Sequence, residues 1–89
     1  MTRSVFSGKY DLFRRLLIEA RKNAGLTQVG LAEKLSHPQS YVSKYERGER
    51  RLDVIEFLEV ARAMGIDPFA FLRALDDTSS IWTPETVSE

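Results

Sequence analysis

Apolar residues recur at the three- and four-residue spacing of an α-helix along most of the chain, and no stretch sustains the alternation of a β-strand. Short breaks that contain glycine, proline or polar residues separate the apolar stretches. The pattern predicts five helices, over residues 10–24, 28–35, 38–48, 54–64 and 69–75. We therefore expect an all-α protein with a compact five-helix domain.

Capping signals mark several of the predicted helix ends. Thr27 can accept a hydrogen bond from a free amide at the start of the second helix. Asp53, with Glu56 three residues later, forms the pattern of a capping box before the fourth helix. Pro38 suits the first position of the third helix, where a missing amide hydrogen costs little. Gly30 has no explanation in the sequence, since a glycine inside a helix costs up to about 1 kcal/mol relative to alanine.

The third predicted helix differs from the others because it offers few apolar side chains to a core. Val42 and Tyr45 fall on one side of it. The remaining side carries hydrogen-bonding groups, namely Gln39, Ser40, Ser43, Lys44 and Arg47. Taken alone, such a face is more typical of a solvated helix, but it can also match the donors and acceptors on base-pair edges in the major groove of DNA. The short break before it favours a helix-turn-helix, in which the second helix enters the groove.

The last two predicted helices are more apolar. In the fourth, the residues expected to face the core are Ile55, Leu58, Val60 and Ala61. The apolar residues of the fifth surround most of that helix, and a small domain cannot bury every side, so one edge is expected to form a two-fold dimer contact. The candidate contact residues are Phe69, Phe71, Leu72, Leu75 and Trp82. Trp82, with its neighbour Ile81, either extends this contact or folds back onto the same chain.

The net charge of the 89-residue chain is zero, but the charges are unevenly distributed. Residues 1–52 hold eleven Lys/Arg against five Asp/Glu, whereas residues 53–89 hold two against eight. A basic face for a polyanion and an acidic face turned away from it would produce this asymmetry. Chance clustering along a short chain is the alternative.

Composition removes several classes of site. The absence of cysteine excludes disulfides, thiolate zinc sites and cysteine nucleophiles. The carboxylates lie on solvated faces and near helix caps, and no metal-ligand cluster, phosphate loop or nucleophile–base set appears, so we expect neither enzymatic activity nor a cofactor. No apolar run approaches the about 20 residues of a membrane helix, and the N-terminus lacks the apolar core of a secretory signal. The expectation is a cytoplasmic protein without a membrane segment.

The stretch TQVGLAEKLSHPQSYVSKYERGERRLD, residues 27–53, resembles the Cro- and Xre-like repressors, which have the lambda-repressor-like DNA-binding fold. The resemblance spans about residues 12–75. It rests on Leu26-Thr27-Gln28, Ala32, Val42, Tyr45, Glu46-Arg47-Gly48 and Leu52-Asp53. We expect a helix-turn-helix domain over residues 10–76, with an N-terminal arm over residues 1–9 and a loose tail over residues 77–89.

The resemblance also implies roles for individual residues. The expected base contacts are Gln39, Ser40, Ser43 and Lys44, and the expected phosphate contacts are Gln28, Arg47, Arg50 and Arg51. Arg21 and Glu46 are expected to form an internal ion pair that fixes the third helix. Two residues depart from the family pattern: Ser36 stands where the turn often has glycine, and His37 stands where an apolar residue is common. We expect His37 to be a surface turn residue or a helix cap.

These features favour a transcriptional regulator, and a repressor in particular, that binds double-stranded DNA as a homodimer. The main alternative is an antitoxin-like or other protein-interaction module. In that alternative, the acidic and aromatic C-terminal region binds a partner protein, and DNA binding is secondary or lost.

Overall fold

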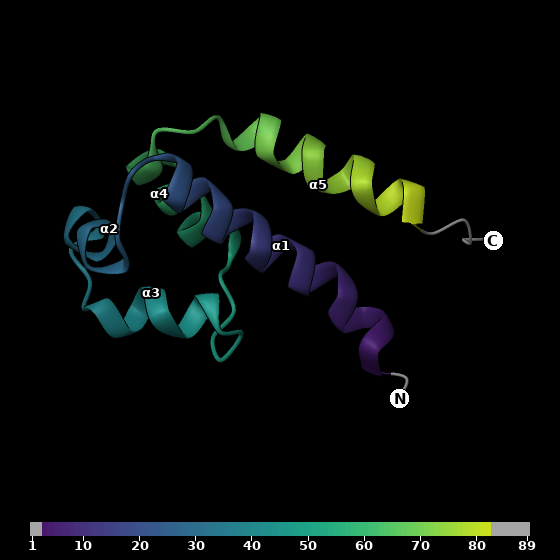
Figure 1. Ribbon diagram of the computed structural model, residues 1–89, viewed down its shortest axis with the longest axis horizontal. Helices are drawn as coiled ribbons and strands as arrows, with labels where there is room; N and C mark the ends of the chain where they lie inside the picture. Colours follow the sequence, from purple (N-terminus) through teal and green to yellow (C-terminus); the bar gives the residue numbers. More distant parts are fainter. Residues whose placement is uncertain (1–2, 83–89) are drawn as a thin grey trace.

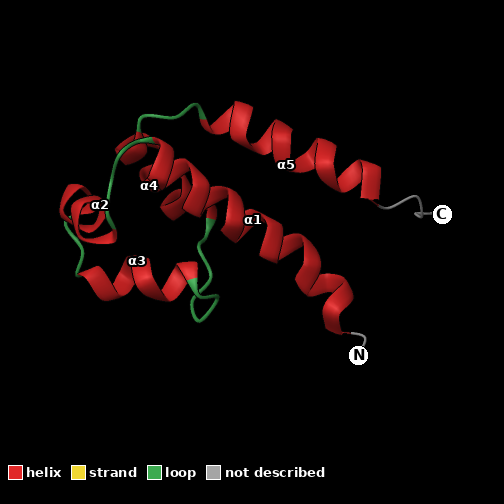
Figure 2. Cartoon of the chain, in the orientation of Figure 1, coloured by secondary structure: helices red, strands yellow, loops and turns green. Residues whose placement is uncertain are grey.

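The computed structural model describes residues 3–82 of the chain, with the side chains of residues 8–77. Five α-helices make up this part of the chain, which contains no strand (Figures 1 and 2). They are α1 (Arg3–Asn23), α2 (Gln28–Leu35), α3 (Gln39–Glu46), α4 (Val54–Met64) and α5 (Pro68–Trp82). The predicted all-α class and five-helix architecture are confirmed. Within residues 3–82, no helix is both long and apolar enough to cross a membrane.

The long helix α1 is the central element of the fold. It contacts α3 on one side and α5 on the other (Figure 1). α2 packs against both α3 and α4, and α4 also contacts α5. In Figure 2, α2 is seen nearly along its axis and α3 from the side, so the two helices of the helix-turn-helix cross each other. α1 and α2 therefore both pack against the inner side of α3.

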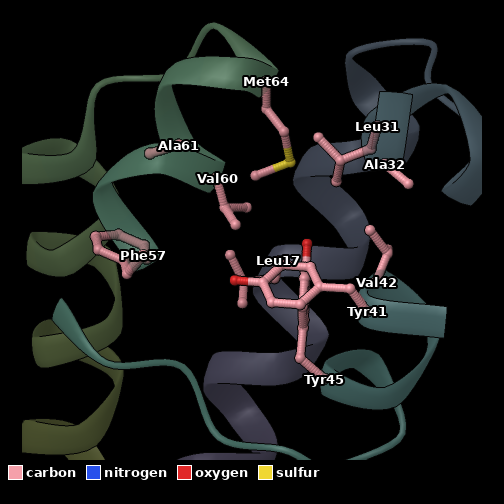
Figure 3. Packing of buried hydrophobic residues seen from close by; sticks show 10 residues of the cluster. All are labelled: Leu17, Leu31, Ala32, Tyr41, Val42, Tyr45, Phe57, Val60, Ala61 and Met64. Carbon is pink, nitrogen blue, oxygen red and sulfur yellow. The ribbon is translucent and has the colours of Figure 1, made fainter. Parts of the chain in front are cut away.

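A single hydrophobic core joins the helices (Figure 3). Its buried members are Leu17, Leu31, Ala32, Tyr41, Val42, Tyr45, Phe57, Val60, Ala61 and Met64. Burying each of the larger aliphatic side chains contributes roughly 1.5–3 kcal/mol. Aromatic rings extend the core toward α5, because the Phe57 ring centroid lies 5.7 Å from that of Phe13 and 5.3 Å from that of Phe71. The core residues predicted on α3, Val42 and Tyr45, are fully enclosed.

The buried side of α4 differs from the prediction at its first turn. Its buried residues follow the spacing of one helix face and are Phe57, Val60, Ala61 and Met64. Ile55 was predicted to face the core and is instead 63% exposed. The reason is helical phase: Ile55 lies four and seven residues before Glu59 and Arg62, which are both exposed, and therefore shares their solvent side.

Two helices extend beyond their predicted boundaries. α1 begins at Arg3 rather than near residue 10, since Gly8 weakens a helix by about 1 kcal/mol but does not end it. α5 continues to Trp82 instead of ending near Leu75. Residues 76–82 contain neither glycine nor proline, so this stretch holds no signal that would terminate a helix already formed.

α3 is shorter at both ends than predicted. Pro38 is the N-cap, with φ −69° and ψ 156°, rather than the first helical residue, and the helix ends at Glu46 with Arg47 as the C-cap. Gly48 then adopts a left-handed φ of 82°. A Cβ atom on Gly48 would lie 3.2 Å from Nε of Arg14, so the glycine allows the chain to leave α3 close beside that side chain.

The predicted caps are present. Thr27 Oγ1 accepts from the Gly30 amide at 2.9 Å, while Asp53 and Glu56 exchange the two hydrogen bonds of a capping box, at 2.8 and 2.9 Å. The cap on α2 also explains Gly30. A Cβ atom on this residue would lie 3.3 Å from Thr27 Oγ1, which is closer than an ordinary contact.

The turn between α2 and α3 depends on a strained serine. Ser36 has φ 59°, which makes it the one non-glycine residue with positive φ in the described chain. The next amide, that of His37, donates to the Ala32 carbonyl at 3.0 Å and closes the end of α2. His37 is exposed, as predicted for a surface turn residue, and its ring stacks on Tyr41 with centroids 4.0 Å apart.

Replacing Ser36 by glycine should raise the free energy of unfolding by about 0.5–1 kcal/mol. A left-handed backbone costs an L residue roughly 1–2 kcal/mol, and the greater freedom of glycine in the unfolded chain cancels part of that gain. Urea unfolding measures the change. Ser40→Gly is the matched control, because Ser40 lies within α3 and should lose about 0.5–1 kcal/mol. A less stable Ser36→Gly protein would contradict the assignment of strain to this turn.

Candidate nucleic-acid interface

α3, the recognition helix of the predicted helix-turn-helix, has two chemically distinct sides. Its buried residues are Tyr41, Val42, Tyr45 and Glu46. Its outer residues are Gln39, Ser40, Lys44 and the half-buried Ser43. All four residues predicted to contact bases therefore lie away from the core. Among the described residues, Ser40 and Lys44 form no side-chain hydrogen bond or ion pair, so both are free to meet a ligand.

Arg21 and Glu46 form the ion pair that the resemblance to Cro- and Xre-like repressors implied. Arg21 donates from Nε to Oε2 of Glu46 at 2.8 Å and from Nη2 to Oε1 at 3.1 Å. The side chains are only 11% and 5% exposed. Arg21 Nη1 also donates to the carbonyl of Leu26 at 3.0 Å, in the loop before α2. A single guanidinium therefore ties α1 to both helices of the helix-turn-helix.

Arg14 makes a second contact that holds α3, and the sequence pattern did not predict it. Its Nη1 donates to the backbone carbonyl of Glu46, at the end of α3, and its Nη2 pairs with Asp11 at 2.7 Å. Arg14 lies seven residues before Arg21, two turns away on the same side of α1. That spacing is the signal that would have identified it.

A chain of amides leads from the buried carboxylate to the outer face. Gln28 Nε2 donates to Oε1 of Glu46 at 2.8 Å, and Gln28 Oε1 accepts from Nε2 of Gln39 at 3.1 Å. A carboxylate can only accept, so Glu46 determines which end of the Gln28 amide faces it. The Gln28 oxygen is thereby turned toward Gln39. As a result, Gln39 keeps its own oxygen and one N–H for an external partner.

Arg47 is bound to a neighbouring acid at the exit of α3. Its Nε and Nη2 donate to the two carboxylate oxygens of Glu49, each at 3.0 Å, and its Nη1 donates to Ser43 Oγ at 2.6 Å. The two charged side chains are 55% and 53% exposed. The hydrogen bonds from Arg47 lower the pKa of the Glu49 carboxyl below its ordinary value. A predicted phosphate contact and a predicted base contact are therefore joined in one surface cluster.

Arg50 and Arg51 are held by internal partners. Arg50 donates to both carboxylate oxygens of Glu56, at 2.7 and 3.1 Å, and its guanidinium lies 4.6 Å from the centroid of the Tyr41 ring. The hydrogen bonds from Arg50, followed by that from the Asp53 amide, lower the pKa of Glu56 to about 2. Arg51 is exposed and stacks on another aromatic side chain, with its guanidinium 4.3 Å from the ring centroid of Tyr10.

A shallow hollow runs beside the outer face of α3. It is lined by His37, Pro38, Ser40, Tyr41, Lys44, Glu49 and Arg50. The two base-contact candidates without internal partners, Ser40 and Lys44, share this hollow with one acid and one cation. No group of three His, Cys, Asp or Glu residues that could hold a metal ion occurs in the described part of the chain.

The candidate dimer residues on α5 fall into different environments. Phe69 and Leu72 are exposed, whereas Phe71 packs against Phe13 and Phe57 at the edge of the core. Leu75 is half-buried. The side chains of Ile81 and Trp82 lie outside the described residues. An apolar surface thus exists on α5, but the core takes up one of its predicted members.

Three comparisons place these features among known proteins. A family model described as helix-turn-helix matches residues 17–71. An HTH-type transcriptional regulator of Sinorhizobium fredii, y4dJ, is 34% identical over 58 residues, which cover 65% of this chain and 75% of that protein. The solved structure of an XRE-family like protein from Pseudomonas syringae pv. tomato is 48% identical, with a TM-score of 0.81 over 86% of this chain and 94% of the other.

Replacing Arg21 by methionine should lower the free energy of unfolding by about 3–5 kcal/mol, because Glu46 would remain buried without its counter-charge. Denaturant unfolding measures the loss. Adding Glu46→Gln to the same chain should recover part of it, since a neutral amide needs no counter-charge and can still accept from Gln28. Arg15→Met is the control, an exposed arginine on the same helix. A loss no larger than that of the control would show that the ion pair does not anchor α3.

Acidification should weaken the fold through Glu56. Its folded-state pKa of about 2 lies below the ordinary value of 4.5, so the ionised carboxyl stabilises the protein above about pH 4.5. This contribution is lost as the pH falls from 4.5 toward 2. Glu56→Gln should cost roughly 0.5–1 kcal/mol at pH 7, and its deficit should narrow steadily over the same interval. Thermal unfolding between pH 7 and 2 tests this, and parallel profiles for the two proteins would refute it.

Proposed function

This chain belongs to the Cro/Xre-like helix-turn-helix family and is a DNA-binding regulator of transcription rather than an enzyme, and on this premise we propose that it recognises a specific operator as a homodimer and represses transcription from it. The observation that carries the proposal is the chain of hydrogen bonds from Arg21 through Glu46 and Gln28 to Gln39. It orients the first side chain of the recognition helix before any DNA is bound.

Gln39 is proposed to read adenine. Its remaining N–H and its carbonyl oxygen suit the N7 acceptor and N6 donor that adenine shows in the major groove. Holding the amide in one orientation removes the alternative in which donor and acceptor exchange places. Discrimination at this base pair then comes from a side chain that loses little freedom on binding.

Ser40, Ser43 and Lys44 are proposed as the other base contacts. Ser40 and Lys44 face the hollow beside α3, and Ser43 lies one turn after Gln39 on the same helix. Lysine favours the O6 and N7 acceptors of guanine, whereas a serine hydroxyl can serve as donor or acceptor. Together with Gln39, these residues would span a few consecutive base pairs.

Phosphate contacts are proposed at both ends of the helix-turn-helix. Gln28 is the first residue of α2, where the free amides and the positive end of the helix dipole favour an anion. Arg51 is exposed beyond α3, and Arg47 can reach a phosphate when it leaves Glu49. Arg50 contributes less, because its Nη groups already bind Glu56 and the Arg51 carbonyl. Such contacts fix the register of the protein on DNA without reading sequence.

The homodimer is proposed to use the apolar surface of α5. Phe69 is 69% exposed and Leu72 is 42% exposed, and α1 separates this helix from α3 (Figure 1). A two-fold contact at α5 would therefore leave both recognition helices uncovered. The half-sites of the operator should then be centred about 34–36 Å apart, or at a multiple of that distance. A dimer bound across a promoter would block access to it.

Two substitutions should separate sequence reading from general affinity for DNA. Gln39→Ala should cost about 1–3 kcal/mol of preference at one base pair, while Arg51→Ala should weaken binding to all duplexes and reduce the salt slope by about one. Gel shifts across a salt series, with an operator selected from random duplexes and a shuffled duplex, measure both effects.

Arg62→Ala is the control, because it removes the same charge from the last turn of α4. Equal binding by the wild type and the Gln39 and Arg51 variants would contradict the proposed function. That outcome would favour a protein-interaction module instead.

A further inference from the structure

An acidic side chain lies within the basic surface that is proposed to meet DNA. Glu49 follows α3 directly and is surrounded in sequence by Arg47, Arg50 and Arg51. It also lines the hollow that holds Ser40 and Lys44. A carboxylate here repels DNA phosphates, so its presence is not explained by general electrostatic attraction to DNA.

We propose that Glu49 is a positioning residue that tunes sequence specificity: it holds Arg47 against the recognition helix, where Arg47 occupies one acceptor position of the Ser43 hydroxyl and favours that hydroxyl as a hydrogen-bond donor. The same ion pair competes with the phosphate contact proposed for Arg47, which forms only when Arg47 leaves Glu49. This inference rests on the proposed function, and it adds a residue to which no base or phosphate contact is assigned.

The geometry of Arg47 supports the proposal that Glu49 holds this side chain against the recognition helix. All three nitrogens of its guanidinium are engaged, two with Glu49 and the third with Ser43 Oγ. The bidentate pair with Glu49 fixes the plane of the guanidinium, which leaves Nη1 directed at the serine. Arg47 and Ser43 are also four residues apart, so helix geometry brings them together without distortion.

The chemistry of Ser43 follows from this contact. A guanidinium only donates, so Ser43 must accept from Arg47, and its own hydroxyl hydrogen is then available to a base. Ser43 is therefore biased toward a base that offers an acceptor, such as N7 or O6 of guanine or O4 of thymine. The N4 amino group of cytosine would find only one remaining acceptor position on that oxygen and would leave the hydroxyl hydrogen without a partner, so cytosine is disfavoured. Glu49 thereby acts on base preference without touching the base.

The exposure of the Arg47–Glu49 pair supports the proposed competition between Glu49 and DNA phosphates for Arg47. Both side chains are more than half exposed, and pairs of this kind are screened by salt and readily exchanged. On a shuffled duplex, where Ser43 finds no matching base, Arg47 is drawn to a phosphate in competition with Glu49. Removing the carboxylate takes away that competition. Binding to unrelated DNA should then gain more than binding to the operator does.

The test is Glu49→Gln, measured on the selected operator and on a shuffled duplex across a salt series. We expect affinity for the shuffled duplex to rise about three- to tenfold with a salt slope steeper by about one, and operator affinity to change by less than about threefold. Adding Arg47→Ala should abolish the gain. Glu19→Gln, at an exposed position on α1, controls for the change in net charge.

Selection from random duplexes provides a second readout. The base pair at which Ser43→Ala loses its preference should be the one at which Glu49→Gln accepts additional bases. The inference is overturned if affinity for the shuffled duplex does not rise, if Glu19→Gln gives the same gain, or if the gain survives Arg47→Ala. A wild-type protein that binds no duplex would overturn the proposed function itself. That result can be told apart from failure of the Glu49 inference, because the tests of Glu49 compare proteins that all bind DNA.

Discussion

The buried carboxylate of Glu46 is the constraint on which the placement of the recognition helix depends. A charge at 5% exposure must be paired and hydrogen-bonded, and here it recruits Arg21 from α1 and Gln28 from α2. Arg14 holds the backbone carbonyl of the same residue. Three helices therefore meet at one side chain. This polar junction compensates for the few apolar residues of α3, whose outer face is left free to carry polar groups.

Two different mechanisms hold the base-facing side chains. Gln39 is oriented by a chain of hydrogen bonds that begins in the interior, where water does not compete and the geometry is strongly determined. Ser43 is oriented by Arg47 and Glu49 at the surface, where water and salt do compete. The hydrogen bonds that orient Gln39 are rigid, whereas those that orient Ser43 can be replaced by contacts with water, salt or phosphate. The two ends of the recognition helix thus differ in how firmly their contacts are fixed in advance.

The sequence predicted features with local causes. Capping chemistry located α2 and α4 correctly, and the resemblance to Cro- and Xre-like repressors supplied the Arg21–Glu46 pair. Features that depend on three-dimensional neighbours were missed. Ile55 lies on an apolar stretch whose phase is set by packing against α2 and α5. The amide chain through Gln28 joins residues eleven and eighteen positions apart. The reason for Gly30 is likewise three-dimensional, because a Cβ atom there would crowd Thr27 Oγ1.

Most of the arginines behind the uneven charge distribution are paired within the protein. The excess of cations in the first half of the chain suggests a strongly basic surface, yet Arg14, Arg21, Arg47 and Arg50 all bind acidic residues of the same chain. Arg51 stacks on Tyr10 and retains its charge for solvent. The number of cations free to neutralise phosphates is therefore much smaller than the sequence count. Since general affinity for DNA grows with that number, pairing arginines internally lowers binding to unrelated sequences and leaves discrimination to the oriented side chains of α3.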